Sequence, residues 1–486
     1  MRDRPATAVP LLRQLETIVG TRWIVTDDEA LAPWCTDWRG RHSGVPMAMV
    51  APADEGEVQQ VMRCCASAAV PVVTQGGNTG LVGGAICDGS GTQLLLSLRR
   101  LNTIRVDNET RTLLCGAGAV LEAVHAAAER EGLRFPLSLA SKGSATIGGL
   151  ASTNAGGTQV LRHGTMRSLV TGVHAVLADG NLLVADTGLR KDNRGFDLKQ
   201  LFIGSEGTLG IITAVRLVLR PAAVARHTAW LGVDSPEQAL SVLTRLQARL
   251  PDQVEAFELM PEVCVGNVVR YLAERQPPLQ GDHPWHVLVE VVDEGRLLTG
   301  EALANEVEAA LGALLKTGMI RDAVLAASGA QAAAFWRLRE SLSAAEKAAG
   351  PALQHDIAVQ PDQMPAVIRD LAKEVPAAFP GYSTRAFGHL GDGNIHLHVV
   401  PPPEAGPGWQ SGVGRKISQF VYDAIVARGG TISAEHGIGA EKRELLARTA
   451  DPVMLGVMRS VKQALDPDEL LNPGKLVPLA PEQARP

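Results

Sequence analysis

The chain is poor in aromatic side chains, which make up 4% of its 486 residues, and only ten of its 46 basic residues are lysines. Its formal charge, 46 − 52 = −6, comes without long runs of like charge. A protein that binds nucleic acid or an anionic membrane needs a basic patch or stripe, which this sequence lacks. We therefore expect no nucleic-acid partner.

No pair of cysteines has the CxxC spacing, and the six cysteines form no regular framework. This usage is typical of a reduced compartment, so we expect a cytoplasmic location and no disulfides. The apolar stretch near the N-terminus, residues 6–12, is short and contains Pro10, so no signal peptide is expected. The cysteines are Cys35, Cys64, Cys65, Cys87, Cys115 and Cys264.

Long hydrophobic runs are missing as well. Residues 64–87 and 143–161 carry no charge, but Pro71 and several glycines, asparagines and threonines interrupt them. A membrane-spanning helix needs about 20 apolar residues, so neither segment qualifies. The GxGxxG and GxxxxGK[ST] phosphate motifs are also absent from the glycine-rich loops, which argues against Rossmann and P-loop nucleotide sites.

What the chain does have is glycine, 50 residues or roughly 10%, against an average of about 7%. Hydrophobic residues make up 45% and charged residues 20%. This composition is typical of a globular protein, and the length suggests two to four domains.

Hydrophobic spacing predicts strands and helices in a mixed order. We expect an α+β protein with three parts: residues 1–223, residues 224–428, and a segment 429–486 that returns to the first part. The middle part is expected to hold an antiparallel sheet covered on one side by helices. The main expected strands are 70–74, 93–97, 112–115, 170–177, 211–219, 227–233, 255–260, 285–292, 384–387 and 395–400, and the main expected helices are 54–70, 119–130, 301–315, 331–349, 363–375 and 417–428.

Three glycine-rich loops occur at residues 75–84, 141–157 and 204–211, and the first of them follows a predicted strand. Consecutive glycines expose backbone N–H groups and permit left-handed backbone angles, as a diphosphate cradle requires. A single loop of this kind is more often a connection without a ligand. Three such loops together indicate a bound cofactor.

The densest group of chemical side chains is His389-Leu-Gly-Asp392-Gly-Asn-Ile-His396-Leu-His398. Glycines on both sides of Asp392 predict a tight turn, and the two-residue strand period places His396 and His398 on one face. Glu435-His436 offers a carboxylate and another imidazole. Two imidazoles and one carboxylate suit zinc or manganese, although each histidine alone would more often be a structural residue.

The order of these loops resembles the FAD domain of the vanillyl-alcohol oxidase superfamily. The whole chain, from about Asp37 to Leu476, is similar to the FAD-linked D-2-hydroxyacid dehydrogenases. This resemblance implies a two-lobed FAD-binding domain of the vanillyl-alcohol oxidase (PCMH) type and a substrate, or cap, domain. Relatives with covalent flavin commonly attach it to a histidine of the first loop, where this chain has neither His nor Cys between Thr74 and Ile86. We therefore expect non-covalent FAD.

The resemblance also implies roles for single residues. The loop 76–80 would bind the FAD pyrophosphate, Gly207 and Ile211 would lie near the adenine, and Asn472 near the isoalloxazine. The implied FAD contacts are Gly76, Gly77, Asn78, Thr79, Gly80, Ser141, Gly143, Ser144, Thr146, Gly149, Asn154, Gly207, Ile211 and Asn472.

In the family resembled, the positions of His389, His396 and Glu435 bind a divalent metal, and that of His436 is the catalytic base. Arg339 matches an arginine that binds the substrate carboxylate, for which a planar guanidinium is suited. The alternative for Arg339 is an ion pair with a neighbouring acid.

Ser343 lies four residues after Arg339, so it is expected on the same helix face, and it matches a hydroxyl position of dicarboxylate-specific relatives. The chain departs from the family twice. His398 stands where many relatives have Asn, so it is either a substrate contact or a third imidazole. Gln354 stands where many have Lys, which weakens the case for a second substrate carboxylate.

The function expected from these features is FAD-dependent oxidation of a D-2-hydroxy acid, of the D-lactate or D-2-hydroxyglutarate class, to the 2-oxo acid. Two alternatives are a flavin oxidase or transferase acting on a non-carboxylate substrate, and a flavoprotein subunit that needs a partner. We expect a soluble or peripheral electron acceptor. The sequence is compatible with a homodimer.

Overall fold

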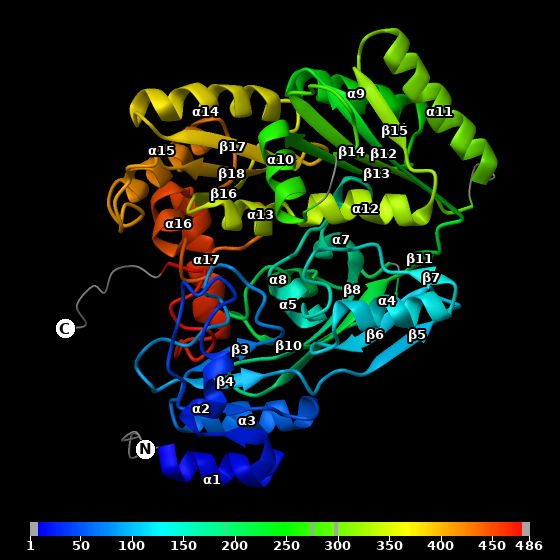
Figure 1. Ribbon diagram of the computed structural model, residues 1–486. Helices are drawn as coiled ribbons and strands as arrows, with labels where there is room; N and C mark the ends of the chain where they lie inside the picture. Colours follow the sequence, from blue (N-terminus) through cyan, green and yellow to red (C-terminus); the bar gives the residue numbers. More distant parts are fainter. Residues whose placement is uncertain (1–7, 190, 274–276, 296–299, 479–486) are drawn as a thin grey trace. The chain divides into compact units, whose positions relative to one another are not determined.

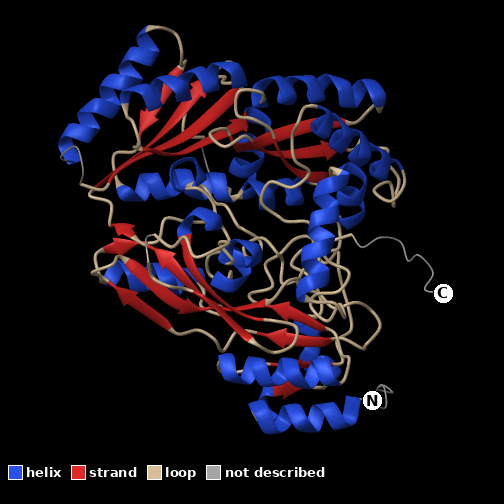
Figure 2. Ribbon diagram, turned by 180° about the vertical axis from the view of Figure 1, so that it is seen from behind, coloured by secondary structure: helices blue, strands red, loops and turns tan. Residues whose placement is uncertain are grey.

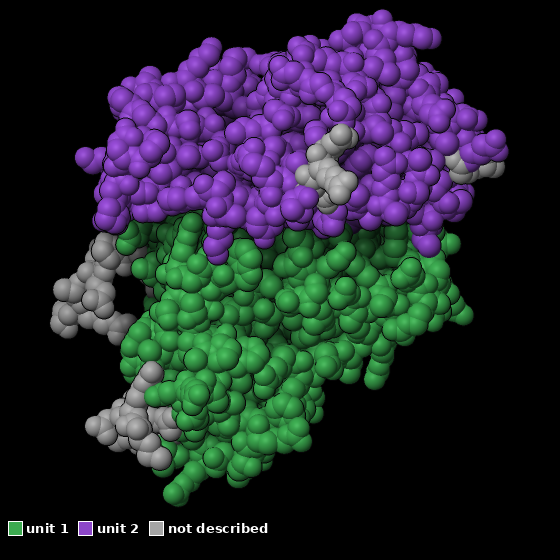
Figure 3. Space-filling view, in the orientation of Figure 1, with its two compact units in different colours: residues 1–156, 165–221, 435–486 green, residues 157–164, 222–434 purple. Residues whose placement is uncertain are grey.

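The computed structural model describes residues 8–189, 191–273, 277–295 and 300–478. Residues 1–7 of the first predicted domain and 479–486 of the last one lie outside these ranges. Helices and sheets occur throughout (Figures 1 and 2). The chain forms two compact units (Figure 3): unit 1 comprises residues 1–156, 165–221 and 435–486, and unit 2 comprises 157–164 and 222–434. The boundaries at 223 and 428 stay a prediction about domains.

Unit 1 contains a four-stranded sheet in which three strands are parallel. The helix predicted after residue 54 is α3, Glu55–Ser67, capped by the Asp54 side chain, and it buries Val58 and Val61 at helical spacing. Helix α1, Ala8–Val19, contributes Leu11 and Leu15 to the same hydrophobic core. The strands, in spatial order, are β1 (Ile24–Val25), β2 (Ala48–Val50), β4 (Leu94–Ser97) and β3 (Val72–Gln75).

The second sheet of unit 1 is antiparallel and has five strands. In spatial order these are β5 (Ile104–Asp107), β6 (Thr112–Gly116), β10 (Ile211–Val218), β8 (Val170–Val176) and β9 (Leu182–Ala185). The other elements of the unit are the 3₁₀ turns Thr21–Trp23 and Ala32–Trp34, α2 (Asp28–Leu31), α4 (Leu121–Arg130), β7 (Leu133–Arg134), α5 (Ile147–Ser152), α7 (Met166–Leu169), α8 (Lys199–Phe202), β11 (Arg220–Pro221), α16 (Arg443–Thr449) and α17 (Pro452–Leu465).

Unit 2 is built on one seven-stranded sheet in which every neighbouring pair is antiparallel. In spatial order its strands are β15 (Asp322–Leu325), β12 (Ala225–Val233), β14 (Trp285–Asp293), β13 (Val254–Pro261), β17 (Ser383–His389), β18 (Asn394–Val400) and β16 (Leu353–Ala358). The short helix α6, Val160–His163, also belongs to this unit. The α+β class and the antiparallel sheet expected in the middle part of the chain are therefore confirmed.

Helices cover both faces of this sheet, so the expectation of helices on one side only is wrong. One face packs Leu259, Val289 and Leu397 under α9, α11, α14 and α15, and the other packs Trp230 and Phe387 with α10, α12 and α13. Figure 1 shows the two groups on opposite sides of the strands. Their bounds are α9 (Pro236–Arg249), α10 (Glu262–Tyr271), α11 (Gly300–Lys316), α12 (Gly329–Glu340), α13 (Leu342–Ala349), α14 (Met364–Ala378) and α15 (Val413–Ala427).

The second face carries the polar side chains that matter below. Register places Glu258 of β13 opposite His389 of β17, and Asp356 of β16 opposite His396 of β18. Alternate residues of β18 enter the apolar core on the other face, as the two-residue period of a strand requires. No helix among the described residues is long and apolar enough to cross a membrane.

Candidate active site

The first glycine loop needs glycine for close packing. A Cβ on Gly77 would lie 1.8 Å from the Ser144 carbonyl oxygen, and one on Gly76 would lie 2.1 Å from Thr146 Oγ1. The first and second glycine loops therefore touch backbone to backbone. The left-handed angles expected of this loop fall instead on Asn78 (φ 52°) and Gly83 (φ 70°).

The first two loops have the donors and acceptors that a dinucleotide needs. Within the described part of the chain, no acceptor pairs with the backbone N–H groups of residues 76–80. Three buried oxygens beside them, Thr74 Oγ1, Gln75 Oε1 and Thr146 Oγ1, have no hydrogen-bond partner among the described residues either. Buried polar atoms are normally satisfied, so a run of N–H donors beside such oxygens fits a bound phosphate-containing cofactor.

The remaining predicted contacts of the second loop are small and accessible. Gly143, Ser144 and Gly149 are exposed, and Ser141 is half-buried. Asn154 has φ 50°, and its side chain accepts a hydrogen bond from the Arg167 backbone N–H at 2.9 Å. Thr79 and Gly80 of the first loop are half-buried and exposed, respectively. Their contacts with FAD stay predictions.

Asn472 holds the loops together through its own amide group. Its Oδ1 accepts a hydrogen bond from the Thr74 N–H at 3.0 Å, and its Nδ2 donates to the Glu206 carbonyl at 2.6 Å and to the Gly84 carbonyl at 3.3 Å. Since the side chain is committed to backbone groups, Asn472 positions the first and third loops. Ile211 is a fully buried core residue of β10.

The third loop contacts the segment after His436 within unit 1. The Glu206 carboxylate accepts hydrogen bonds from the backbone N–H groups of Ile438 and Gly439, both at 2.7 Å. Burial raises the pKa of this carboxyl, while the two N–H donors oppose the rise. Gly207 follows with φ 72°, and a Cβ there would lie 3.0 Å from Asn472 Nδ2.

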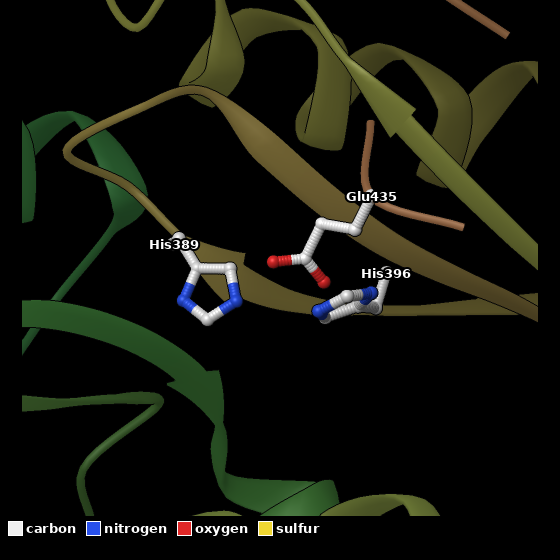
Figure 4. Close-up of side chains that lie close together, drawn as sticks. All are labelled: His389, His396 and Glu435. Carbon is white, nitrogen blue, oxygen red and sulfur yellow. The ribbon is translucent and has the colours of Figure 1, made fainter. Parts of the chain in front are cut away.

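The predicted metal ligands come together (Figure 4). Ligand atoms of His389, His396 and Glu435 all lie within 4.8 Å of one another. His389 ends β17 and His396 lies on β18, joined by the tight turn in which Asp392 Oδ1 accepts the Asn394 N–H at 3.1 Å. Glu435 directly follows unit 2 along the chain.

His436 lies next to this group. Ligand atoms of Asp356, Glu435 and His436 form a second set within 4.8 Å. Strand β16 pairs Asp356 with His396 of β18. A backbone bridge between Ala358 and Thr431 places the segment before Glu435 beside the same strand. The donor set of two imidazoles and a carboxylate, with a further imidazole beside it, fits a divalent transition metal.

Arg339 and His389 share one buried carboxylate. Glu258 Oε1 lies 2.6 Å from His389 Nδ1, and Glu258 Oε2 accepts a hydrogen bond from Arg339 Nε at 2.7 Å. Burial by itself raises the pKa of the Glu258 carboxyl, but the charges of Arg339 and His389 outweigh it and lower this pKa. The pair uses only the Nε–H edge, so the two terminal amino groups of Arg339 carry four further donors.

Ser343 does not share a continuous helix with Arg339. Helix α12 ends at Glu340, and Ser343 is exposed on α13 while Arg339 is buried. The expected one-turn spacing is therefore wrong, because the helix breaks at Ser341. A substrate contact of Ser343 stays a prediction.

The two departures from the family pattern are neighbours. Gln354 of β16 pairs directly with His398 of β18, which pairs on its other side with Arg385 of β17. His398 is buried, and its Nδ1 lies 3.9 Å from Glu346 Oε2. Burial alone would raise the pKa of Glu346, but the neighbouring His398 imidazole and the hydrogen bonds donated by Asn267 and Arg385 lower it to about 2.

Sequence reasoning missed three acidic residues. Glu206 stood inside a loop interpreted as glycine-rich, Glu258 inside a segment interpreted only as a strand, and Glu346 inside a helix. The available signal was a carboxylate at a position that should be buried, since such groups are rare unless paired. In the sequence Glu-Ala-Phe-Glu-Leu-Met of residues 255–260, both acids are completely buried.

The comparisons with known proteins agree with these features. The family described as FAD linked oxidases, C-terminal domain, matches residues 223–476, and the FAD binding domain family matches residues 46–186. The fold and the loops thus define an FAD-linked oxidoreductase. Among solved structures, p-cresol methylhydroxylase superposes with a TM-score of 0.74 at 14% identity over 97% of both chains. Alkyldihydroxyacetonephosphate synthase superposes with a TM-score of 0.73 at 15% identity, over 98% of this chain and 87% of the other, so both share the fold.

Two curated relatives narrow the class further. The mitochondrial D-2-hydroxyglutarate dehydrogenase of Bos taurus is 36% identical over 96% of this chain and 83% of its own length. The D-2-hydroxyglutarate dehydrogenase of Xanthomonas citri pv. viticola is also 36% identical, over 96% of this chain and 97% of its own. The chain belongs to the FAD-linked D-2-hydroxyacid dehydrogenases, flavin-dependent oxidoreductases that act on CH–OH donors.

Proposed function

We propose that this enzyme oxidises a D-2-hydroxy acid to the 2-oxo acid with the help of a divalent metal, zinc or manganese. The observation that carries the proposal is the convergence of His389, His396 and Glu435 within 4.8 Å, with Arg339 joined to His389 through Glu258. Bound there, the metal would lower the pKa of the substrate hydroxyl, and FAD would accept the two electrons at N5.

The protein's own side chains would bind the substrate and move its proton. The terminal amino groups of Arg339 would hold the carboxylate at C1 in a bidentate pair, which fixes the orientation of the C2–H bond. His436 would accept the hydroxyl proton at a ring nitrogen. Its position beside Glu435 supports this role. Because His436 also forms a possible ligand set with Asp356 and Glu435, the alternative role for His436 is to bind the metal.

The substrate class follows from the relatives' names and the residues around His398. Both relatives are named for D-2-hydroxyglutarate, so a substrate of the D-lactate or D-2-hydroxyglutarate class is proposed. Arg385 already pairs with Glu346 at 2.9 Å, and Gln354 and His398 add no permanent charge. The row formed by Arg385, His398 and Gln354 therefore has little spare positive charge for a second carboxylate.

We further propose that FAD is held without a covalent bond and that electrons leave to a soluble or peripheral acceptor. A cytoplasmic location is proposed from the cysteine pattern, whereas the bovine relative is named mitochondrial. A homodimer is compatible with the chain.

Anaerobic titration of the FAD-containing protein tests the reaction. Paired D- and L-2-hydroxy acids are added with and without a chelator, and the visible absorbance of the flavin is followed. We expect bleaching by a D-acid only, abolished by the chelator and restored by zinc or manganese. The His436→Ala variant should keep its FAD and lose reduction by about 10²-fold or more, the usual contribution of a general base.

Other outcomes would redirect the proposal. Absence of bleaching by every hydroxy acid in metal-replete protein would contradict it and favour a transferase or a partner-dependent subunit. Bleaching that ignores the chelator would remove the metal from the mechanism. Unchanged reduction in the His436→Ala variant would remove His436 from the role of base.

A further inference from the structure

Glu258 is placed where a carboxylate is costly. It lies in the interior of β13, its side chain is 1% exposed, and it pairs across the strands with His389 of β17 and Leu288 of β14. Met260 and Leu288 beside it belong to a hydrophobic cluster. Burying an ion in such surroundings costs several kcal/mol unless it is paired and hydrogen-bonded.

Both partners of this carboxylate are residues with proposed roles. One oxygen faces His389 Nδ1 at 2.6 Å, and the other accepts from Arg339 Nε at 2.7 Å. The ring of Phe387 holds the guanidinium from another side, with the Arg339 Cζ atom 5.6 Å from the ring centroid. A single rigid group therefore joins the imidazole and the guanidinium.

The contact also selects the tautomer of His389. An ionised carboxylate only accepts hydrogen bonds, so Nδ1 carries an N–H in either protonation state of the ring, and Nε2 is the nitrogen that has the lone pair once the ring is neutral and able to bind a metal. In Figure 4 one ring nitrogen of His389 points toward Glu435 and His396, and the other points away from them. Because Nδ1 is engaged by Glu258, the nitrogen that faces the other ligands is Nε2.

We propose that Glu258 is a positioning residue that prepares His389 for metal binding and at the same time fixes Arg339 relative to that metal. This inference rests on the proposed function, which supplies the roles of His389 and Arg339. A carboxylate behind a histidine ligand orients the ring and raises its basicity, and removing such a partner typically weakens metal binding 10- to 100-fold.

Glu258→Gln tests the inference, because it keeps the volume and removes the charge. Glu290→Gln is the matched control: Glu290 is a buried carboxylate on the same face of the sheet, bonded to Arg226, Thr228 and Trp336. Zinc and manganese affinities are measured by competition with a chelator on the FAD-containing protein. We expect Glu258→Gln to bind at least 10-fold more weakly than the wild type, and Glu290→Gln to bind as the wild type does.

A second readout separates positioning from a purely structural role. At saturating metal, Glu258→Gln should still show a KM for the D-2-hydroxy acid raised at least 10-fold, with unchanged FAD content, because Arg339 is no longer held. If this variant does not fold, Glu258→Met combined with Arg339→Met replaces the ion pair by apolar side chains of similar volume. The double variant should show the same loss of metal affinity.

The outcomes are distinguishable. Wild-type metal affinity in Glu258→Gln or in the double variant would overturn this inference alone. A wild-type protein that binds neither metal would overturn the metal part of the proposed function, and this inference with it. An equal loss in Glu290→Gln would show that any buried charge matters and would also overturn the inference.

Discussion

At the scale of single residues, the second face of the sheet in unit 2 concentrates buried carboxylates that already have partners. Glu258 and Glu346 each accept hydrogen bonds from a guanidinium and lie beside a histidine. Such groups keep their charge away from water only because their partners surround them. The contacts of these carboxylates therefore contribute to the free energy of unfolding of unit 2 and also hold the arginine and histidine side chains of this face in place.

Glu346 makes this connection measurable through pH. Its pKa is lowered from 4.5 to about 2, although burial alone would raise it. The lowered pKa in the folded state means that its stabilising contribution is complete above about pH 5 and is lost as the pH falls toward 2. A difference of this size corresponds to about 3 kcal/mol.

We therefore expect the Glu346→Gln variant to be less stable than the wild type at pH 7, with the gap narrowing between pH 5 and pH 3. Denaturant unfolding at several pH values measures the gap. Glu374→Gln is the control, since its ion pair with Arg428 is partly exposed and should contribute less than 1 kcal/mol. A gap for Glu346→Gln that is constant from pH 7 to pH 3 would contradict the assigned cause.

At the scale of elements, the packing of the first two glycine loops depends on the absence of a Cβ. The Gly77 site leaves 1.8 Å between such an atom and the Ser144 carbonyl oxygen, which is backbone and does not move cheaply. Gly77→Ala should destabilise the apoprotein by about 2 kcal/mol or more and release FAD. Thermal unfolding and the flavin content after gel filtration measure both effects.

Gly89→Ala is the matched control for this prediction. A Cβ at Gly89 meets nothing within 4 Å, and its backbone angle is not in the left-handed region. It should change stability by less than about 0.5 kcal/mol. If Gly77→Ala behaves like the control, the two loops are not in the tight contact described above.

The elements of the site were predicted unevenly by the sequence. The β-strand period correctly placed His396 and His398 on one face, and the Gly-Asp-Gly turn before them is present. The helix over 331–349 was predicted as one piece, because Ala, Glu and Arg favour helix throughout. The structure has two helices that meet at Ser341, and the second packs Leu342 and Ala345 against α10, a tertiary contact that local helix propensity does not contain.

At the scale of the whole molecule, a short segment that interrupts unit 1 along the chain, residues 157–164, belongs to unit 2. Residues 157–164 join it through Glu255, whose buried carboxylate accepts from Gln159 Nε2 at 2.9 Å and from Arg162 at 3.0 Å. His163 Nε2 lies 3.3 Å from the same carboxylate. One bulged position of β13 thus anchors the segment.

Glu255→Gln should therefore loosen this segment and lower the free energy of unfolding by about 2 kcal/mol, because Arg162 loses its charged hydrogen-bond acceptor and, of its described carboxylate partners, only Glu294, 3.7 Å away, still faces the guanidinium. Limited proteolysis with trypsin should show faster cleavage after Arg162. Glu306→Gln, which breaks the exposed pair with Arg249, is the control and should change neither. Unchanged cleavage after Arg162 would show that other contacts hold the segment.

The sequence by itself determined the class of fold, the three glycine loops and the residue types of the histidine and carboxylate cluster. These depend on local periodicity and on short motifs, which the order of residues contains. Only the tertiary structure decided that Glu258 joins Arg339 to His389, that Asn472 holds two loops, and that Gln354 faces His398. Each of these contacts joins residues that are distant along the chain. Which side chain pairs with a buried charge depends on the register of neighbouring strands, and that register is a property of the tertiary structure.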